Sequence, residues 1–267
     1  MADDSRPIGI FDSGVGGLTV FRELSRHLPE ESLVYLGDTA RVPYGSKSRD
    51  TVIRYANACA QLLLKQDVKL LVVACNTASA FALDALKSTL SVPVVGVVEP
   101  GAYAALSRTK NNHIGVIGTV GTVASKAYTQ AILHLRHNAA VYTQACPLFV
   151  PLAEEGWTTG DVPRLVAKNY LEPLLMRGID TLVLGCTHYP LLASVIQETV
   201  GIGVTLVDSA EETARTVADV VKNHNLACSP GQIPQYRFLV SDAPENFLKT
   251  SRHFLKQVSA PVEWVDF

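Results

Sequence analysis

The sequence has no long hydrophobic run and no strong excess of either charge. Its longest apolar stretches, such as residues 70–75, fall far below the roughly 20 residues that a membrane helix needs. The net charge is -2, without the clustered basic excess that is typical of a nucleic-acid surface. The first seven residues, MADDSRP, lack the basic and apolar regions of a signal peptide. We therefore expect a cytoplasmic protein with a small-molecule partner, no membrane contact and no nucleic-acid partner.

Cysteine is scarce and scattered. The five cysteines, Cys59, Cys75, Cys146, Cys186 and Cys228, are an odd number and include no C-x-x-C pair. This pattern is typical of reduced thiols and disfavours a disulfide framework, a zinc site or a thiol redox protein. We expect no bound metal.

What is present is a globular α/β composition in 267 residues, with 48% hydrophobic and 18% charged residues. Short apolar runs alternate with longer segments of helical periodicity, which predicts parallel sheets flanked by helices. The predicted strands are Ile8–Phe11, Leu33–Gly37, Leu70–Ala74, Val94–Val98, Ile114–Gly118, Ala140–Ala145, Thr181–Gly185, Val204–Val207, Arg237–Val240 and Val262–Val265. The clearest predicted helices are Ser48–Lys65, Thr77–Ser88, Val120–Leu135, Val162–Met176 (bent or ended near Pro173), Glu211–His224 and Glu245–Gln257.

An internal repeat divides the chain. The run IGIFDSGVGG at residues 8–17 resembles IGVIGTVGTV at residues 114–123, which aligns Ser13 with Thr119. Each run is followed by the same order of strands and helices. The fold class is therefore expected to be α/β, with two similar doubly wound parallel-sheet domains related by pseudo-two-fold symmetry. We expect residues 1–98 plus 209–267 to form one domain and residues 99–208 the other.

The repeat also pairs two cysteines. The third strand of the first copy ends at Cys75, followed by Asn76, and the third strand of the second copy ends at Cys186, followed by Thr187. Ligands of open α/β sheets bind outside the carboxyl ends of the strands. The polar loops RVPYGSKS and CPLFVPLAEEG belong to the same edges. The sequence therefore predicts one cleft between the two domains, with a thiol on each wall.

Each of these features has a plainer interpretation. A single cysteine is more often a small packing residue than a reagent, and that interpretation stands for Cys59, Cys146 and Cys228. The run DSGVGGLT could be a phosphate-binding turn of a dinucleotide-binding module, with Asp38 near a ribose. That match is poor because Thr19 stands where a glycine is required. The turn could instead aim backbone N–H groups at a carboxylate ligand.

Two thiols that face each other favour inversion of a stereocentre. One group removes a proton from one face of a carbon and the other returns a proton to the opposite face. A free cysteine has a pKa of about 8.5, so one thiolate and one thiol can coexist after modest tuning. A pyridoxal-phosphate racemase is an alternative mechanism, but it requires a Schiff-base lysine, and only Lys47 is predicted in a cleft loop.

Six collinear runs, IGIFDSGVGGLTV, GDTARVPYGSKS, VVACNTASA, GVVEPGA, PLFVPLAEEG and GCTHYPLL, resemble those of the glutamate racemase family, which is part of the aspartate/glutamate racemase superfamily. The resemblance runs from about residue 8 to 210. It implies an enzyme without a cofactor that supplies D-glutamate for bacterial peptidoglycan synthesis and works as a homodimer. It further implies that Cys75 and Cys186 are the acid/base pair. Asp12 would assist Cys75, and His188, with Glu154, would assist Cys186.

The resemblance also implies a set of substrate-binding residues around the two thiols. Ser13, Asn76 and Thr187 would hold the α-carboxylate and amino end of glutamate. The remaining expected contacts, several of them to the side-chain carboxylate, are Asp12, Pro43, Tyr44, Gly45, Ser46, Thr77, Thr119, Thr122 and His188.

Overall fold

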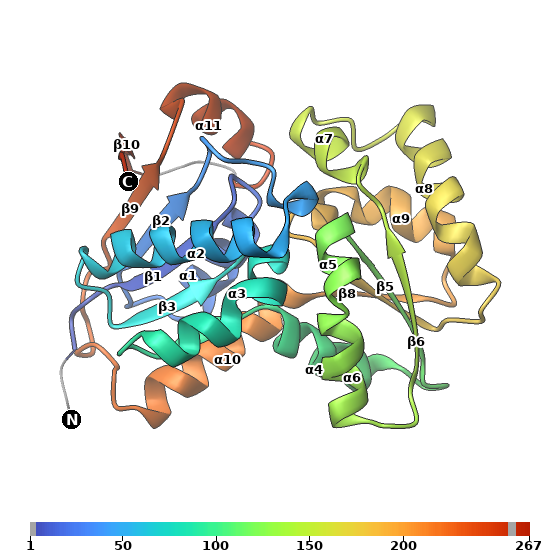
Figure 1. Cartoon of the computed structure of the whole chain (residues 1–267), viewed down its shortest axis with the longest axis horizontal. Coiled ribbons are helices and arrows are strands. Elements are labelled where there is room, and N and C mark those ends of the chain that lie inside the picture. The colour runs from blue at the N-terminus through green and yellow to red at the C-terminus, as the bar shows by residue number, and fades with distance from the viewer. Residues whose placement is uncertain (1–3, 256–259) are drawn as a thin grey trace.

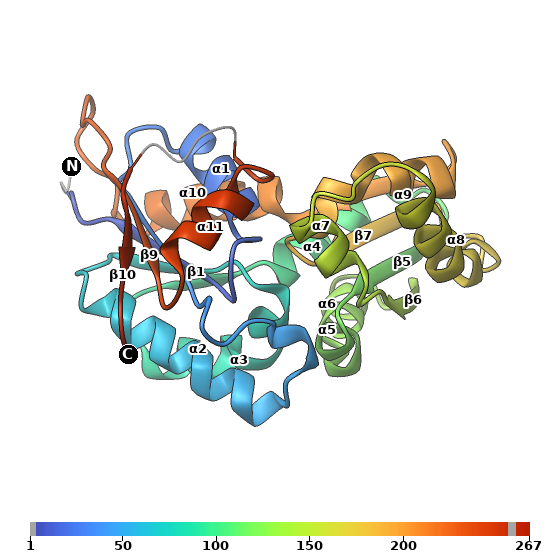
Figure 2. The same ribbon diagram turned by 90° about the horizontal axis from the view of Figure 1, so that it is seen from above.

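The computed structural model describes residues 4–255 and 260–267, which form two parallel sheets with helices on both faces. The strands of the first sheet lie in the order β10-β9-β2-β1-β3-β4, and those of the second in the order β6-β5-β7-β8. The order β2-β1-β3-β4 therefore recurs as β6-β5-β7-β8, which confirms the repeat and the α/β fold class. Figures 1 and 2 show the two sheets side by side, each between its own helices.

The elements follow the chain as an alternation of strands and helices. The first-sheet strands are β1 Ile8–Asp12, β2 Leu33–Gly37, β3 Leu70–Val73, β4 Val94–Gly96, β9 Tyr236–Val240 and β10 Val262–Trp264. The second-sheet strands are β5 His113–Gly118, β6 Ala140–Ala145, β7 Thr181–Gly185 and β8 Thr205–Asp208. The helices are α1 Leu18–His27, α2 Arg49–Leu64, α3 Asn76–Thr89, α4 Val98–Arg108, α5 Val120–Ser125, α6 Ala127–Leu135, α7 Phe149–Glu154, α8 Asp161–Leu175, α9 Ala193–Val200, α10 Ser209–Asn223 and α11 Pro244–Ser251, with 3-10 turns η1 Tyr44–Ser46 and η2 Tyr189–Leu192.

Four apolar cores fill the spaces between sheets and helices. Helices α1 and α10 cover one face of the first sheet, while α2 and α3 cover the other. In the same way α8 and α9 cover one face of the second sheet, and α4 and α6 the other. Strands β1, β2 and β7 are buried along their whole length, as expected for strands packed on both faces. This burial holds the carboxyl ends of the strands in fixed positions.

The predicted helix Val120–Leu135 is wrong as a single element, because the chain breaks it at Lys126. Lys126 has left-handed backbone angles and separates α5 from α6. The Ser125 hydroxyl donates to the Thr122 carbonyl at 2.6 Å and accepts the Ala127 N–H at 3.1 Å. A serine side chain thus takes backbone partners at the break. Helix α6 therefore begins as a separate element at Ala127.

The predicted strand Val94–Val98 is too long. Strand β4 ends at Gly96, and Val98 is already the first residue of α4. The Ser79 hydroxyl accepts a hydrogen bond from the Val97 N–H at 3.2 Å and donates one to the Val73 carbonyl at 2.8 Å. Directly after β4, a serine side chain therefore takes the place of a backbone partner from the neighbouring strand. Helix α4 also runs through residues 99–101, where the sequence predicts a crossing between domains. The domain boundaries stay a prediction.

Two further differences concern the later part of the chain. Residues 146–156, expected as a loop, contain the short helix α7. The helix expected over Glu245–Gln257 ends at Ser251, and residues 256 and 257 lie outside the described part of the chain. The remaining predicted strands and helices are confirmed with their ends shifted by a residue or two. None of the helices in the described part has the length and apolar character needed to cross a membrane.

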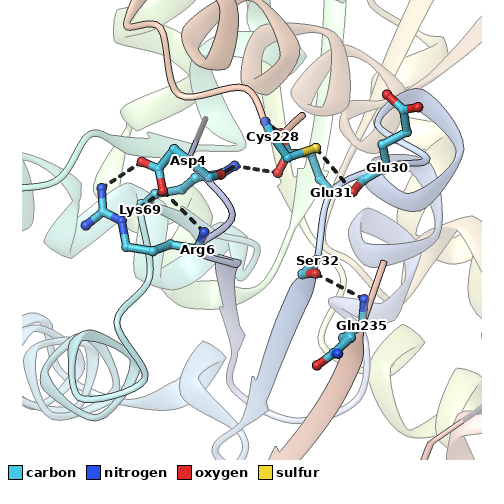
Figure 3. A network of polar contacts seen from close by, with 8 residues as sticks. All are labelled: Asp4, Arg6, Glu30, Glu31, Ser32, Lys69, Cys228 and Gln235. Atoms are coloured by element: carbon cyan, nitrogen blue, oxygen red, sulfur yellow. Dashed lines mark hydrogen bonds and ion pairs between the residues drawn. The ribbon is translucent and has the colours of Figure 1, made fainter. Parts of the chain in front are cut away.

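A buried ion pair between Lys69 and Glu31 lies at the amino edge of the first sheet, just before strands β3 and β2 (Figure 3). Lys69 Nζ is 2.5 Å from Glu31 Oε2 and donates to the Asp4 carbonyl at 2.6 Å. The Cys228 N–H donates to the other Glu31 oxygen at 3.1 Å. These contacts join the segments before β1, β2 and β3 to the connection that leads to β9.

Candidate active site

Cys75 and Cys186 line one cavity of about 140 Å³ at the carboxyl ends of the two sheets. Cys75 follows β3 and precedes α3, and Cys186 follows β7, so the two thiols occupy the equivalent positions that the repeat predicts. Both are buried, with 6% and 7% exposure. The cavity is lined by Ser13, Val42, Pro43, Tyr44, Gly45, Ser46, Cys75, Asn76, Thr77, Thr119, Val120, Pro147, Val150, Pro151, Cys186, Thr187 and His188. Its size suits a small metabolite, because drug-sized ligands occupy pockets of roughly 300 Å³ or more.

Cys75 is surrounded by groups that keep its proton in place. Burial, together with the negative charge of Asp12, raises the pKa of the Cys75 thiol to about 12. The Ala78 N–H and the Ser13 hydroxyl, 3.7 Å from the sulfur, act the other way. At neutral pH the free site therefore holds Cys75 as a thiol.

Cys186 has a different neighbour, the imidazole of His188. The sulfur is 3.8 Å from His188 Nδ1, while His188 Nε2 is 3.0 Å from Glu154 Oε1. Burial lowers the pKa of His188, but its hydrogen bonds to Cys186 and Glu154 outweigh this effect and raise the pKa to about 10. His188 is consequently protonated at neutral pH. The arrangement can pass a proton between a thiol and an imidazole.

Asp12 ends β1 beneath the glycine-rich turn and does not line the cavity. It is fully buried, and its Oδ2 accepts the Gly14 N–H at 2.9 Å. Burial raises the pKa of Asp12, while the charge of His188 and the N–H groups of the turn oppose this shift. Its Oδ1 has no hydrogen-bond partner within residues 4–255 and 260–267. The carboxylate thus occupies N–H groups that a phosphate or carboxylate ligand of this turn would need.

Three threonines join the two walls of the cavity. Thr77 Oγ1, at the start of α3, is 2.9 Å from Thr119 Oγ1 and 3.1 Å from Thr122 Oγ1, both from the second sheet's first turn. Thr119 and Thr122 are also 3.0 Å apart. Hydroxyls can turn to donate to an anion, so this cluster can bind a carboxylate without a lysine or arginine.

The loop that carries Tyr44 is held from behind by Asp38. The Tyr44 hydroxyl donates to Asp38 Oδ2, and the Ser241 hydroxyl donates to Oδ1 at 2.9 Å. Arg41 Nε is 2.8 Å from the same carboxylate. Asp38 therefore has its acceptors filled, which leaves it poorly suited to a ribose.

Most of the predicted catalytic and substrate-binding residues line the cavity, and three lie just behind its wall. Asp12, Glu154 and Thr122 are in this second position, each next to a lining residue. Part of the cavity wall is apolar and was not predicted from the sequence; it consists of Val42, Val120, Pro147, Val150 and Pro151. The proline-bearing runs RVPYGSKS and CPLFVPLAEEG contain most of these residues and could have indicated an apolar wall. Apolar walls limit water in the site and strengthen electrostatic interactions there.

Other residues weighed from the sequence lie elsewhere. Lys47 does not line the cavity within the described part of the chain. Cys59 is buried against the Tyr44 hydroxyl, and Cys146 is fully buried, as expected of packing residues. No group of three or more His, Cys, Asp or Glu side chains in residues 4–255 and 260–267 is arranged to hold a metal ion.

A larger hollow of about 890 Å³ lies between α3, α4, α6 and α10. It contains neither Cys75 nor Cys186 and is lined by exposed residues such as Glu99 and Tyr103. The smaller cavity is the candidate active site because it holds both thiols.

Comparison with known proteins agrees with this geometry. The family model for Asp/Glu/hydantoin racemases matches residues 8–217. A glutamate racemase of Geobacter metallireducens is 56% identical over 94% of this chain and 93% of its own length. A glutamate racemase structure from Bacillus anthracis has a TM-score of 0.94 at 41% identity, covering 98% of both chains. A structure from Francisella tularensis, a glutamate racemase in complex with D-glutamate, has a TM-score of 0.92 at 38% identity and covers 98% of both chains.

Proposed function

The chain belongs to the Asp/Glu/hydantoin racemase family, and from this premise we propose that it interconverts L- and D-glutamate through two cysteines. One observation carries the proposal: two buried thiols at repeat-equivalent strand ends line a single small cavity. The relatives named as glutamate racemases support the choice of glutamate. The bound D-glutamate of the Francisella structure supports a cavity of this kind as its binding place.

In the proposed reaction, one cysteine thiolate takes the α-proton of glutamate and becomes a thiol. The electron pair left on the α-carbon then takes a proton from the other cysteine, on the opposite face, which becomes the thiolate. The configuration is inverted, and the two cysteines have exchanged protonation states. His188, bonded to Cys186, and Asp12, near Cys75, are the groups placed to restore them. In the reverse reaction the two cysteines exchange roles.

The α C–H group of an amino acid is a very weak acid. The site must therefore stabilise the negative charge that develops as the α-proton leaves. Donors fixed in a water-poor cavity are the usual means. We propose that Ser13, Asn76 and Thr187 hold the α-carboxylate and amino end. The side-chain carboxylate would take the hydroxyls of Thr77 and Thr119, supported by Thr122, and the backbone of residues 43–46.

The test is to incubate the purified protein with L-glutamate and separately with L-aspartate, adding no cofactor, and to follow the enantiomers by chiral chromatography. We expect D-glutamate to accumulate toward an equal mixture, and aspartate to react much more slowly. Absence of D-glutamate would contradict the proposal. Visible absorbance of pyridoxal phosphate in the purified protein would favour the alternative mechanism.

The resemblance further supports a role in supplying D-glutamate for bacterial peptidoglycan, with the protein acting as a cytoplasmic homodimer. Expression in a bacterial strain that requires D-glutamate tests the first part, because growth without the supplement is expected. Sedimentation of the purified protein tests the dimer.

A further inference from the structure

Tyr128 is a buried tyrosine next to the cavity that none of the proposed roles includes. It is the second residue of α6 and is 2% exposed. Two glycines make room for its ring: a Cβ on Gly185 would lie 3.1 Å from Cε2, and a Cβ on Gly101 would lie 3.1 Å from Cε1 and from the hydroxyl. Gly185 directly precedes Cys186. The ring is therefore fixed against the backbone that carries the second thiol.

The Tyr128 hydroxyl joins parts of both repeats. It accepts a hydrogen bond of 2.8 Å from Asn76 Nδ2, at the start of α3 in the first repeat. Ser209, the first residue of α10, directly after β8, lies close by: a Cβ on Gly101 would be 3.2 Å from Ser209 Cβ and 3.1 Å from the tyrosine hydroxyl. A tyrosine hydroxyl can accept a hydrogen bond through its oxygen, as it does here from Asn76.

The contact with Tyr128 leaves the other end of the Asn76 amide free. Asn76 lines the cavity and is 3% exposed, and its Oδ1 is buried with no hydrogen-bond partner in the described part of the chain. A buried carbonyl oxygen without a donor is unfavourable, which indicates that a ligand supplies one. Glutamate has two carboxylates, which only accept hydrogen bonds, and one ammonium group, which donates. The ammonium is thus its matching group.

We propose that Tyr128 is a positioning residue that holds the Asn76 amide with its carbonyl oxygen toward the substrate ammonium group. This inference rests on the proposed function, because it concerns the same cavity and the same substrate. Without the tyrosine hydroxyl, the amide can rotate and present its NH₂ group to the ammonium, which opposes binding.

The test is Tyr128→Phe, which removes the hydroxyl and keeps the ring. We expect KM for glutamate to rise about two- to tenfold, the effect of one net hydrogen bond, with kcat changed less than about twofold. Glutarate, which has both carboxylates but no amino group, serves as a competitive inhibitor. Its inhibition constant is expected to stay within about twofold of the original value, because it makes no ammonium contact.

Two controls separate positioning from a general structural effect. Tyr103→Phe removes the hydroxyl of an exposed tyrosine that lines the larger hollow and not the cavity with the thiols, and it should leave KM and kcat unchanged. In an Asn76→Ala background, adding Tyr128→Phe should raise KM no further, because the two residues act as a unit.

The inference would be overturned if Tyr128→Phe weakened the binding of glutamate and of glutarate equally. It would also be overturned if KM for glutamate stayed unchanged, or if the effects of Tyr128→Phe and Asn76→Ala on KM were additive. These outcomes are distinct from failure of the proposed function, which is the absence of glutamate racemisation by the unmodified protein.

Discussion

The two thiols of the cavity have different partners although the repeat makes their positions equivalent. Cys75 lies next to the buried carboxylate of Asp12, and Cys186 bonds to His188. The raised pKa of Cys75 favours its thiol form, and the raised pKa of His188 keeps its imidazole protonated at neutral pH. The two walls of the cavity therefore differ in charge, with a buried carboxylate behind one thiol and an imidazolium beside the other.

The pKa of His188 depends on Glu154, which leads to a prediction for Glu154→Gln. The variant removes a carboxylate whose hydrogen bond raises the pKa of His188, now about 10. The imidazolium is stabilised below this pKa and loses its proton as pH rises through it. We expect the titration midpoint of His188, measured by NMR of labelled histidine, to move to lower pH in the variant.

Glu155→Gln is the matched control, because Glu155 is the exposed neighbour on the same segment. In Glu155→Gln, the titration midpoint of His188 should equal that of the original protein. An unshifted midpoint in Glu154→Gln would show that Glu154 does not hold the imidazolium.

Among the elements, the turn between β1 and α1 packs closely against the second repeat. A Cβ built on Gly16 would lie 2.6 Å from His188 Nδ1 and would also collide with Thr187. Glycine is therefore required at this position because the opposite loop packs directly on the backbone.

Gly16→Ala is expected to push the turn and the His188 loop apart and so misplace both walls of the cavity. A displacement on the order of 1 Å costs about a hundredfold in rate, which sets the expected fall in kcat/KM for glutamate. Gly203→Ala is the control, since nothing lies within 4 Å of a Cβ there. Equal kinetics of the two variants would argue against close packing at Gly16.

The sequence predicted the parts of the site that rest on strand ends. Cys75 and Cys186 follow buried strands with clear apolar patterns, and parallel pairing brings such ends to one edge. It did not predict the break at Lys126, because that depends on Ser125 taking backbone partners. It did not predict the role of Tyr128 either, because the contact of this tyrosine with Asn76 joins residues of different repeats that are far apart in the sequence.

For the whole molecule, the amino edge of the first sheet contributes stability and is remote from the chemistry. Lys69→Met would leave Glu31 buried without its ion-pair partner, and breaking a buried pair in this way costs about 3–5 kcal/mol. We expect the free energy of unfolding, measured with urea, to fall by that amount while KM for glutamate stays the same. Replacing both partners, in Lys69→Met with Glu31→Leu, should recover much of the loss. A loss below about 1 kcal/mol in the single variant would contradict the importance of this pair.

The central claim is that two cysteines act on opposite faces of one carbon, and isotope exchange in heavy water tests it most directly. L-glutamate is incubated with the protein, and the α-position of both enantiomers is examined at low conversion by mass spectrometry after chiral separation. We predict deuterium at the α-carbon of the D-glutamate product and protium in the remaining L-glutamate, because the proton removed by one cysteine is not the one returned by the other. Cys75→Ala and Cys186→Ala should each abolish inversion. Protium retained in the product, or inversion at the original rate in both variants, would contradict the claim.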